Sequence, residues 1–180
     1  MHPAIFLDRD GVINENRAAY VRSWQDVVFI PQAITALRAV AHLPHKIIVV
    51  TNQSAVGRGI LTLAEAEALN RQIVAAVQAQ GGRIDAVFMC PHAPEDDCAC
   101  RKPKPGLLQQ AAAALQLDLS RAIMVGDALS DVLAGQAAGV RTAALVLSGR
   151  GQEQVKNAAA IPPFPIYPTL AEALADLVLK

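Results

Sequence analysis

The amino-acid sequence predicts an α/β fold built on a parallel, doubly wound sheet. Three observations lead to this prediction. Short apolar runs rich in β-branched residues alternate with stretches of helical pattern along the chain. The runs are apolar throughout, as expected for strands that are buried on both faces. Polar and charged residues follow several runs directly, at the strand ends where such sheets bind ligands.

Five strands and five helices are expected. The strands are Ala4–Leu7, Ile47–Val50, Ala86–Met89, Ile123–Val125 and Thr142–Leu147. The helices are Ala33–His42, Leu63–Gln80, Leu107–Leu117, Asp131–Ala138 and a last one from Thr169 through Leu179. Thr62 and Glu65 form a capping-box pattern at the start of the second helix, and Gly139 ends the fourth. The stretch from Gly149 to Pro168 is expected to be a loop or extended connection.

Length and charge limit the class of protein. A chain of 180 residues has the size of one domain, so we expect residues 1–180 to form a single domain. Lys plus Arg and Asp plus Glu each number 16, and 4% of residues are aromatic, which does not favour nucleic acid as a partner. No apolar run approaches the roughly 18 residues of a membrane span, and none at the start has the length of a signal peptide. We expect a cytoplasmic monomer with no membrane partner.

Three cysteines and one histidine are clustered, in the order Cys90, His92, Cys98 and Cys100. An odd and clustered set of cysteines is a poor basis for disulfides. Thiolates and imidazole in this ratio are ligands of tetrahedral Zn²⁺, and four protein ligands make such a site closed and structural. The alternative is a set of free surface thiols beside an unrelated histidine. We predict a structural Zn²⁺ site in a small loop.

The first strand runs directly into two spaced carboxylates and a glycine, Asp8, Asp10 and Gly11. Two carboxylates at the tip of one strand need a cation to balance their charge, most simply Mg²⁺. Glycine then allows a tight turn. The alternative explanation for this segment alone is an acidic β-turn.

Further polar residues stand at or after the later strands. Thr51 ends the second strand, Lys102 lies between the third and fourth, and Asp127 with Asp131 follows the fourth. Taken singly, they have ordinary explanations: a helix cap, a solvated surface charge or a plain turn. Those explanations do not account for their joint position, because the carboxyl ends of parallel strands meet at one edge of the sheet. We expect these side chains to share one site.

These motifs resemble those of the haloacid dehalogenase superfamily of phosphatases, which use an aspartate nucleophile. The segments FLDRDGVIN, TNQSAVGRG, RKPKPG and VGD, with the cysteine–histidine cluster, are similar to one branch of it. That branch contains D-glycero-D-manno-heptose-1,7-bisphosphate 7-phosphatases and histidinol-phosphate phosphatases. The resemblance covers roughly residues 4 to 150. It implies a Rossmann-like core that is essentially capless, because the gaps between motifs are too short for a cap domain.

The resemblance also implies a role for each motif residue. Asp8 is the expected nucleophile and Asp10 the general acid and base. Thr51 and Lys102 are expected to stabilise the phosphoryl oxygens. The expected ligands of Mg²⁺ are Asp8, the main-chain carbonyl of Asp10 and Asp127. For Asp131 two roles stay open: a water-mediated contact with Mg²⁺, or the orientation of Lys102.

An open site suits a substrate that itself fills the crevice. The expected substrate contacts are polar residues after the first two strands and beside Lys102: Asn16, Tyr20, Asn52, Gln53, Ser54, Arg58 and Arg101. A second phosphate on the substrate needs a cation beyond Lys102. Arg58 or Arg101 can supply it through a two-pronged guanidinium contact.

We therefore expect a Mg²⁺-dependent phosphomonoesterase that forms an aspartyl-phosphate intermediate and acts on a small phosphorylated sugar. The resemblance favours removal of the C7 phosphate of D-glycero-D-manno-heptose 1,7-bisphosphate, on the route to ADP-heptose and the lipopolysaccharide core. Histidinol phosphate or another small sugar phosphate is the alternative substrate. A receiver-like signalling module that accepts a phosphoryl group is the alternative from another class. The pair of Asp8 and Asp10 argues against it, because a receiver needs no general acid to expel an alcohol.

Overall fold

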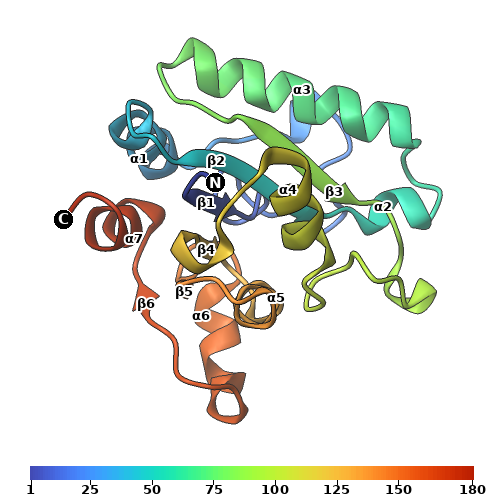
Figure 1. The fold of residues 1–180 in the computed structure, drawn as a ribbon. Coiled ribbons are helices and arrows are strands. Elements are labelled where there is room, and N and C mark those ends of the chain that lie inside the picture. Colours follow the sequence, from blue (N-terminus) through green and yellow to red (C-terminus); the bar gives the residue numbers. More distant parts are fainter.

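The computed structural model describes the backbone of residues 1–180, and every side chain except those of Asn157, Ala159 and Ala160. Its centre is a six-stranded parallel sheet with the strand order β3-β2-β1-β4-β5-β6 (Figure 1). The strands are β1 (Ala4–Leu7), β2 (Lys46–Asn52), β3 (Ala86–Cys90), β4 (Ile123–Gly126), β5 (Thr142–Val146) and β6 (Ile166–Tyr167). The predicted α/β fold with a doubly wound parallel sheet is confirmed.

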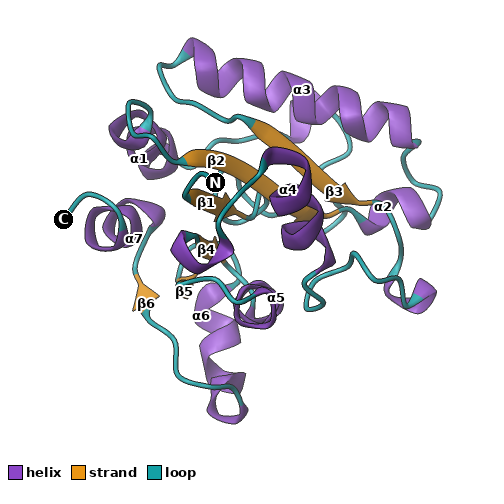
Figure 2. Ribbon diagram, viewed as in Figure 1, coloured by secondary structure: helices purple, strands orange, loops and turns teal.

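Helices cover both faces of this sheet (Figure 2). They are α1 (Pro31–Val40), α2 (Ser54–Gly57), α3 (Leu63–Ala79), α4 (Gly106–Leu115), α5 (Leu129–Ala138), α6 (Gly151–Gln154) and α7 (Leu170–Leu177). Short 3₁₀ turns lie at Trp24–Asp26, Pro94–Asp96, Leu119–Arg121 and Val155–Ala160. Among the described residues, no helix combines the length and apolar character that a membrane crossing requires.

The central strand β1 divides the core into two parts. Ile5 and Leu7 pack with residues of α1, α3 and α7 on one face of the sheet. Ala4 and Phe6 pack with residues of α4 and α5 on the other face. All four side chains of the strand are fully buried. This two-sided burial is the reason why the strand reads as a continuous apolar run and not as an alternating one.

The strand order fixes where a ligand can bind. The chain winds outward from β1 to β3, returns to the centre at β4, and then winds to the opposite edge. The carboxyl ends of β1 and β4 are level, because Leu7 pairs with Val125. In sheets of this kind the crevice at this reversal is the place where ligands bind.

The predicted helix ends agree with the structure at two places. Thr62 Oγ1 accepts a hydrogen bond from Glu65 N at 3.2 Å, and Thr62 N donates to Glu65 Oε2 at 2.8 Å, so the predicted capping box is confirmed. Gly139 ends α5 in the left-handed conformation, with φ +76°.

One stretch differs from its prediction. The segment from Gly149 to Pro168, expected to be a loop or extended connection, contains α6, a 3₁₀ turn and β6. The strand β6 has only two residues, which pair with Leu145 and Val146 of β5. Two residues among prolines are too few to show the periodic pattern of a strand, so the sequence could not predict this pairing with β5. The four-residue helix α2 is equally short and was not expected.

Candidate active site and metal sites

A cavity of about 700 Å³ opens at the carboxyl edge of the sheet, where the strand order reverses. The expected site residues that line it are Asp8, Asp10, Asn16, Tyr20, Thr51, Asn52, Ser54, Arg101, Lys102 and Asp131. The structure therefore brings together residues that lie more than 100 positions apart in the chain. Asp127 lies at its base, fully buried.

Lys102 is the buried cation of this site. Its side chain is 2% exposed, and its Nζ lies 3.0 Å from Asp8 Oδ1 and 2.6 Å from Asp131 Oδ1. It also donates a hydrogen bond to the carbonyl of Val50 at 2.7 Å. Burial alone would lower the pKa of Lys102, but Asp131 and Asp8 together raise it above its ordinary value. The lysine therefore stays an ammonium ion.

The backbone of Lys102 is held from the end of β2. Asn52 Nδ2 donates to the Lys102 carbonyl at 3.0 Å, and Lys102 N donates to Asn52 Oδ1 at 3.1 Å. This pair of hydrogen bonds fixes the loop between β3 and α4 against the sheet. The side chain can then extend beneath β2 toward the two carboxylates.

Three carboxylates crowd this site. Asp8, Asp127 and Asp131 each place an oxygen within 4.8 Å of the other two. Burial, together with the negative charges of Asp131 and Asp10, raises the pKa of Asp8 to about 6 in spite of Lys102. Burial and the Asp8 charge also raise the pKa of Asp127. The cluster holds more negative charge than Lys102 balances.

The donor set fits a divalent cation. Asp8 Oδ1 is buried and has no hydrogen-bond partner; the Lys102 ammonium lies 3.0 Å from it as an ion pair. An unpaired buried carboxylate oxygen beside a second carboxylate is what a hard cation with oxygen ligands requires. Asp8 and Asp127 are therefore suitable ligands of Mg²⁺.

Two glycines leave room for Asp127. Its Oδ2 accepts hydrogen bonds from Asn16 Nδ2 at 2.7 Å and from Arg150 N at 2.9 Å. A Cβ atom on Gly11 would lie 2.1 Å from this oxygen, and one on Gly149 would lie 2.4 Å from it. Both glycines also have positive φ angles, +86° and +57°. Any side chain at either position would displace the Asp127 carboxylate.

Both oxygens of Asp131 are engaged. Oδ1 contacts Lys102, and Oδ2 accepts a hydrogen bond from Ala128 N at 3.1 Å, at the first turn of α5. The side chain is 1% exposed. Asp131 thus contacts Lys102 and also belongs to the carboxylate cluster, so both roles that the sequence left open stay predictions.

Asp10 is held by hydrogen bonds from several sides. The guanidinium of Arg9 contacts both of its oxygens, at 2.9 and 2.8 Å. Asn14 Nδ2 donates to Oδ1 at 2.8 Å, and Gln53 Nε2 donates to Oδ2 at 3.0 Å. Burial alone would raise the pKa of Asp10, but Arg9, Asn14 and Gln53 lower it below its ordinary value.

Two predicted substrate contacts lie elsewhere. Gln53 is 4% exposed and does not line the cavity; its amide Nε2 donates hydrogen bonds to Asp10 Oδ2 and Thr51 Oγ1. Arg58 does not line the cavity either, because its guanidinium points to Glu95 at 3.1 Å on the surface. The sequence alone could not separate these two from Asn52 and Ser54, since all four lie in the short segment from the end of β2 to Arg58.

Some residues of the site were not predicted. Arg150 lines the cavity and contacts Asp127, and Arg9 with Asn14 surrounds Asp10. Arg9 gave one signal in the sequence, as a charged residue directly between two site aspartates. Arg150 gave none, because it lies in the segment that was expected to be a connection.

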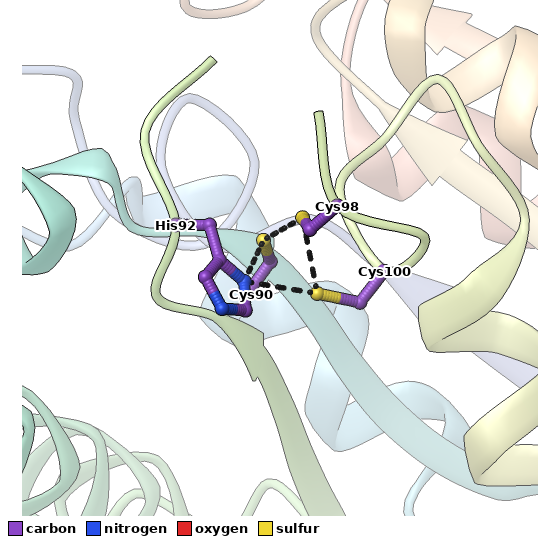
Figure 3. A group of neighbouring side chains, drawn as sticks. All are labelled: Cys90, His92, Cys98 and Cys100. Atoms are coloured by element: carbon purple, nitrogen blue, oxygen red, sulfur yellow. Dashed lines mark hydrogen bonds between the residues drawn. The ribbon is translucent and has the colours of Figure 1, made fainter. Parts of the chain in front are cut away.

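The four predicted Zn²⁺ ligands converge (Figure 3). Cys90 Sγ lies 3.5 Å from Cys98 Sγ, and Cys98 Sγ lies 3.4 Å from Cys100 Sγ. His92 Nδ1 lies 3.6 Å from Cys90 Sγ and 3.4 Å from Cys100 Sγ. A tetrahedral site with Zn–S bonds of about 2.3 Å has neighbouring ligand atoms at about 3.8 Å or slightly less. The three thiols form no disulfide.

The chemistry of these four groups also fits a cation. Burial, reinforced by the neighbouring Cys90 and Cys98 sulfurs, raises the pKa of Cys100 to about 12. Three thiols this close cannot all ionise unless a positive charge compensates them. A tetrahedral Zn²⁺ supplies that charge, and its ligand positions are then all taken by protein.

The chain is similar to known hydrolases and phosphatases. A family model described as HAD-hydrolase-like matches residues 99–173. The D-glycero-β-D-manno-heptose-1,7-bisphosphate 7-phosphatase of Bordetella bronchiseptica is 38% identical over 149 residues, which are 83% of this chain and 83% of that protein. The protein of the same name from Escherichia coli K12 is 38% identical and the match covers 99% of this chain and 88% of its own.

A solved structure extends the similarity to three dimensions. It is the D,D-heptose 1,7-bisphosphate phosphatase of B. bronchiseptica, complexed with magnesium and phosphate. It aligns with a TM-score of 0.91 and 33% identity, over 98% of both chains.

We predict that Cys98→Ser removes one ligand of a structural Zn²⁺ site. Zinc content should fall well below one ion per chain, and the melting temperature should drop by at least about 5 °C, because the metal stabilises the loop. Metal analysis and thermal unfolding measure both. Ser120→Ala, an exposed change elsewhere, should leave zinc content unchanged. Equal zinc content in the Cys98 variant and the unmodified protein would contradict the assignment.

We predict that the crowded carboxylates destabilise the metal-free protein at neutral pH. The pKa of Asp8 is raised from 3.8 to about 6, so its ionised form costs stability above pH 6, and this cost vanishes as the pH falls toward 3.8. Asp127→Asn removes one charge. It should raise the melting temperature of the metal-free protein at pH 7.5 by about 2–4 °C, and by less at pH 5.

The same variant tests Mg²⁺ binding. Saturating Mg²⁺ should stabilise the unmodified protein at pH 7.5 by about 2–3 kcal/mol, and the variant far less, because a ligand is lost. Thermal unfolding with and without Mg²⁺ gives both values. A pH-independent effect of the substitution, or an undiminished response to Mg²⁺, would show that Asp127 does not belong to a cation site.

Proposed function

The chain belongs to the haloacid dehalogenase-like hydrolases, among the heptose-bisphosphate phosphatases, and we propose that it removes the C7 phosphate of D-glycero-β-D-manno-heptose 1,7-bisphosphate. One observation carries the proposal. Asp8, Asp10, Lys102 and Asp127 meet at the reversal of the sheet, in a chain that is 38% identical to phosphatases of that name. The chain is a phosphatase; the substrate and the residue roles below are our proposal.

The first step transfers the phosphoryl group to Asp8. A carboxylate oxygen of Asp8 attacks phosphorus, and the bond from phosphorus to the C7 oxygen breaks. Arg9, Asn14 and Gln53 lower the pKa of Asp10, so it has to take up a proton as the substrate binds. It gives this proton to the departing oxygen, so that an alcohol leaves rather than an alkoxide. Oδ1 of Asp8 accepts no hydrogen bond, so none has to break before one carboxylate oxygen attacks while the other is left to the cation.

The second step releases phosphate. A water molecule attacks phosphorus of the aspartyl phosphate, and Asp10, now ionised, takes a proton from that water. The bond between phosphorus and Asp8 breaks, inorganic phosphate leaves, and both aspartates return to their starting state. Asp10 must therefore alternate between acid and base, which its position at the cavity wall supports.

Positive charge and hydrogen bonds stabilise the transferring group. Lys102 presents its ammonium group 3.0 Å from Asp8 Oδ1, next to the position of the phosphoryl oxygens. Thr51, 1% exposed, lines the same cavity and offers a hydroxyl. Asp131 holds Lys102 at 2.6 Å and so keeps the ammonium in place.

Mg²⁺ is the proposed catalytic cofactor. Asp8, Asp127 and the main-chain carbonyl of Asp10 are the proposed ligands, and the bound ion neutralises charge on the phosphate and the carboxylates. The cysteine–histidine cluster is proposed to hold Zn²⁺ and to stabilise its loop. Three thiols in one cluster fit the reducing cytoplasm as the site of action. We propose further that residues 1–180 act as one domain and as a monomer.

The distal phosphate of the substrate is proposed to meet Arg101. This side chain lines the cavity and is held in position by hydrogen bonds to Ser54 Oγ and the carbonyl of His92, both at 3.1 Å. A guanidinium fixed at the cavity wall can bind a phosphate with two parallel hydrogen bonds. Substrates with one phosphate lack this contact.

We predict that the enzyme prefers the bisphosphate. With Mg²⁺ present, kcat/KM for heptose 1β,7-bisphosphate should exceed that for histidinol phosphate by on the order of 10²-fold, since one charged contact is absent from the latter. Arg101→Gln should reduce this preference, while Arg58→Gln should leave it unchanged, because Arg58 lies outside the cavity. Comparable kcat/KM values for both substrates would refute the substrate assignment and leave a general phosphatase.

We predict that Asp8→Asn abolishes turnover. The loss in kcat should be about 10⁴-fold or more, because the amide cannot form the covalent intermediate. Steady-state kinetics measure it, with zinc content and thermal unfolding as controls for the fold. Asp118→Asn, a change at a half-buried aspartate that does not line the cavity, should retain full activity. Residual activity of the Asp8 variant within tenfold of the unmodified enzyme would mean that another group is the nucleophile.

A further inference from the structure

The bulkiest side chain among the fully buried residues described is an arginine beside the proposed nucleophile. Arg9 is 1% exposed and lies between Asp8 and Asp10 in the chain. Burial of a guanidinium is costly unless the charge is paired and its N–H groups are bonded. Arg9 does not line the cavity, and the proposed chemistry gives it no task.

The contacts of Arg9 fix it at both ends. Toward the site, Nε donates to Asp10 Oδ1 at 2.9 Å and Nη2 donates to Asp10 Oδ2 at 2.8 Å. On the other side, Nη1 donates to Asn70 Oδ1 of α3 at 2.8 Å, in a fully buried hydrogen bond. Asn70 is itself 6% exposed and contacts Met89 Sδ of β3 at 3.5 Å. The guanidinium plane therefore has one orientation.

The hydrogen-bond donors around Asp10 differ in whether they have another acceptor. Four hydrogen bonds, two from Arg9 and one each from Asn14 and Gln53, occupy the acceptor positions of its carboxylate. To donate a proton to a leaving group, Asp10 has to exchange one of these partners. Gln53 Nε2 has a second acceptor, Thr51 Oγ1 at 2.9 Å, so its amide keeps one of its two hydrogen bonds when it releases Asp10. Asn14 Nδ2 has a second acceptor of the same kind, the Glu15 carbonyl at 3.1 Å. Arg9 has no such alternative on its Asp10 side.

We propose that Arg9, anchored by Asn70, is a positioning residue for Asp10. Its two-pronged contact holds the plane of the carboxylate while Oδ2 exchanges Gln53 for the leaving-group oxygen. This inference rests on the proposed function, since it takes Asp10 as the general acid. Helix α3, none of whose residues lines the active-site cavity, thereby supports the chemistry from the opposite face of the sheet.

Arg9→Lys separates the charge of Arg9 from its shape. A lysine can neutralise Asp10, but its ammonium cannot contact both oxygens in one plane and cannot reach Asn70 at the same time. Asn70→Ala is the milder companion change. It removes the anchor and leaves the contact between Arg9 and Asp10 in place.

The test compares two leaving groups through kcat/KM, which reports the steps up to phosphorylation of Asp8. The leaving group of a sugar phosphate is a strongly basic alkoxide, which needs a proton. The leaving group of p-nitrophenyl phosphate is p-nitrophenolate, which is stable without one. We expect Arg9→Lys to lower kcat/KM for the sugar phosphate by about 10²-fold, and for p-nitrophenyl phosphate by less than about tenfold. Asn70→Ala should show the same selectivity with a smaller loss. Asp10→Asn removes the general acid completely, so its losses of kcat/KM on the two substrates are the reference for the other variants.

Arg83→Lys is the matched control for a general loss of stability. Its guanidinium donates hydrogen bonds to the carbonyls of Ala41, Leu43 and His45. These residues precede β2, so they lie at the amino ends of the strands, away from the active-site cavity. This variant should unfold at lower temperature but show no selectivity between the two phosphates.

The outcomes separate the two proposals. A selective loss in Asp10→Asn, together with an equal loss on both phosphates in Arg9→Lys, would overturn the role of Arg9. If Arg9→Lys does not fold, an equal loss on both phosphates in Asn70→Ala would overturn that role in its place. A non-selective loss in Asp10→Asn would instead reject Asp10 as the acid, and with it the proposed mechanism.

Discussion

The burial of one ammonium group among carboxylates is the interaction on which the site depends. Lys102 Nζ forms ion pairs with Asp8 and Asp131 and donates a hydrogen bond to the Val50 carbonyl. Without this cation, the carboxylates that gather at the sheet reversal would be buried without compensation, and each would resist ionisation. Lys102 offsets part of that charge. The remainder raises the pKa of Asp8 and Asp127 and creates the demand for a divalent cation.

The placement of Lys102 depends in turn on the cysteine–histidine loop. Cys100 precedes it by two residues, while Cys90 ends β3 and His92 follows two residues later. The four ligand atoms therefore join the end of the edge strand to the start of the segment that carries Lys102 (Figure 3). Asn52 fixes the other side of that segment. The Zn²⁺ proposed for this cluster would act on the chemistry indirectly, by limiting where the lysine backbone can lie.

The sequence predicted what depends on local pattern and missed what depends on packing. Five of the six strands could be predicted from apolar runs, and Asp8 and Asp127 from their place at strand ends. Lys102 lies in the loop between β3 and α4, and the family resemblance identified it. Neither β6 nor the role of Arg150 could be predicted from the sequence, because each is defined by a contact with a residue or strand far along the chain. The strand β6 pairs with β5, and Arg150 contacts Asp127. Gln53 and Arg58 lie within six residues of one another with similar polarity, and only the turn of α2 decides that neither faces the cavity.

The alternation of side chains along β1 explains how Asp8 and Arg9, which directly follow the strand, lie on opposite faces of the sheet. Phe6 packs toward α4 and α5, and Asp8, two residues later, continues on that side to meet Lys102 and Asp131. Leu7 packs on the face of α1 and α3, and Arg9 continues there to meet Asn70. The period of two thus places the aspartate on one side of the sheet and its neighbouring arginine on the other. A shift by one residue would exchange them, leaving an arginine beside Lys102 and a lone carboxylate against α3. The apolar pattern of residues 4–7 therefore fixes the register of the strand and, through it, the side on which each charged group is buried.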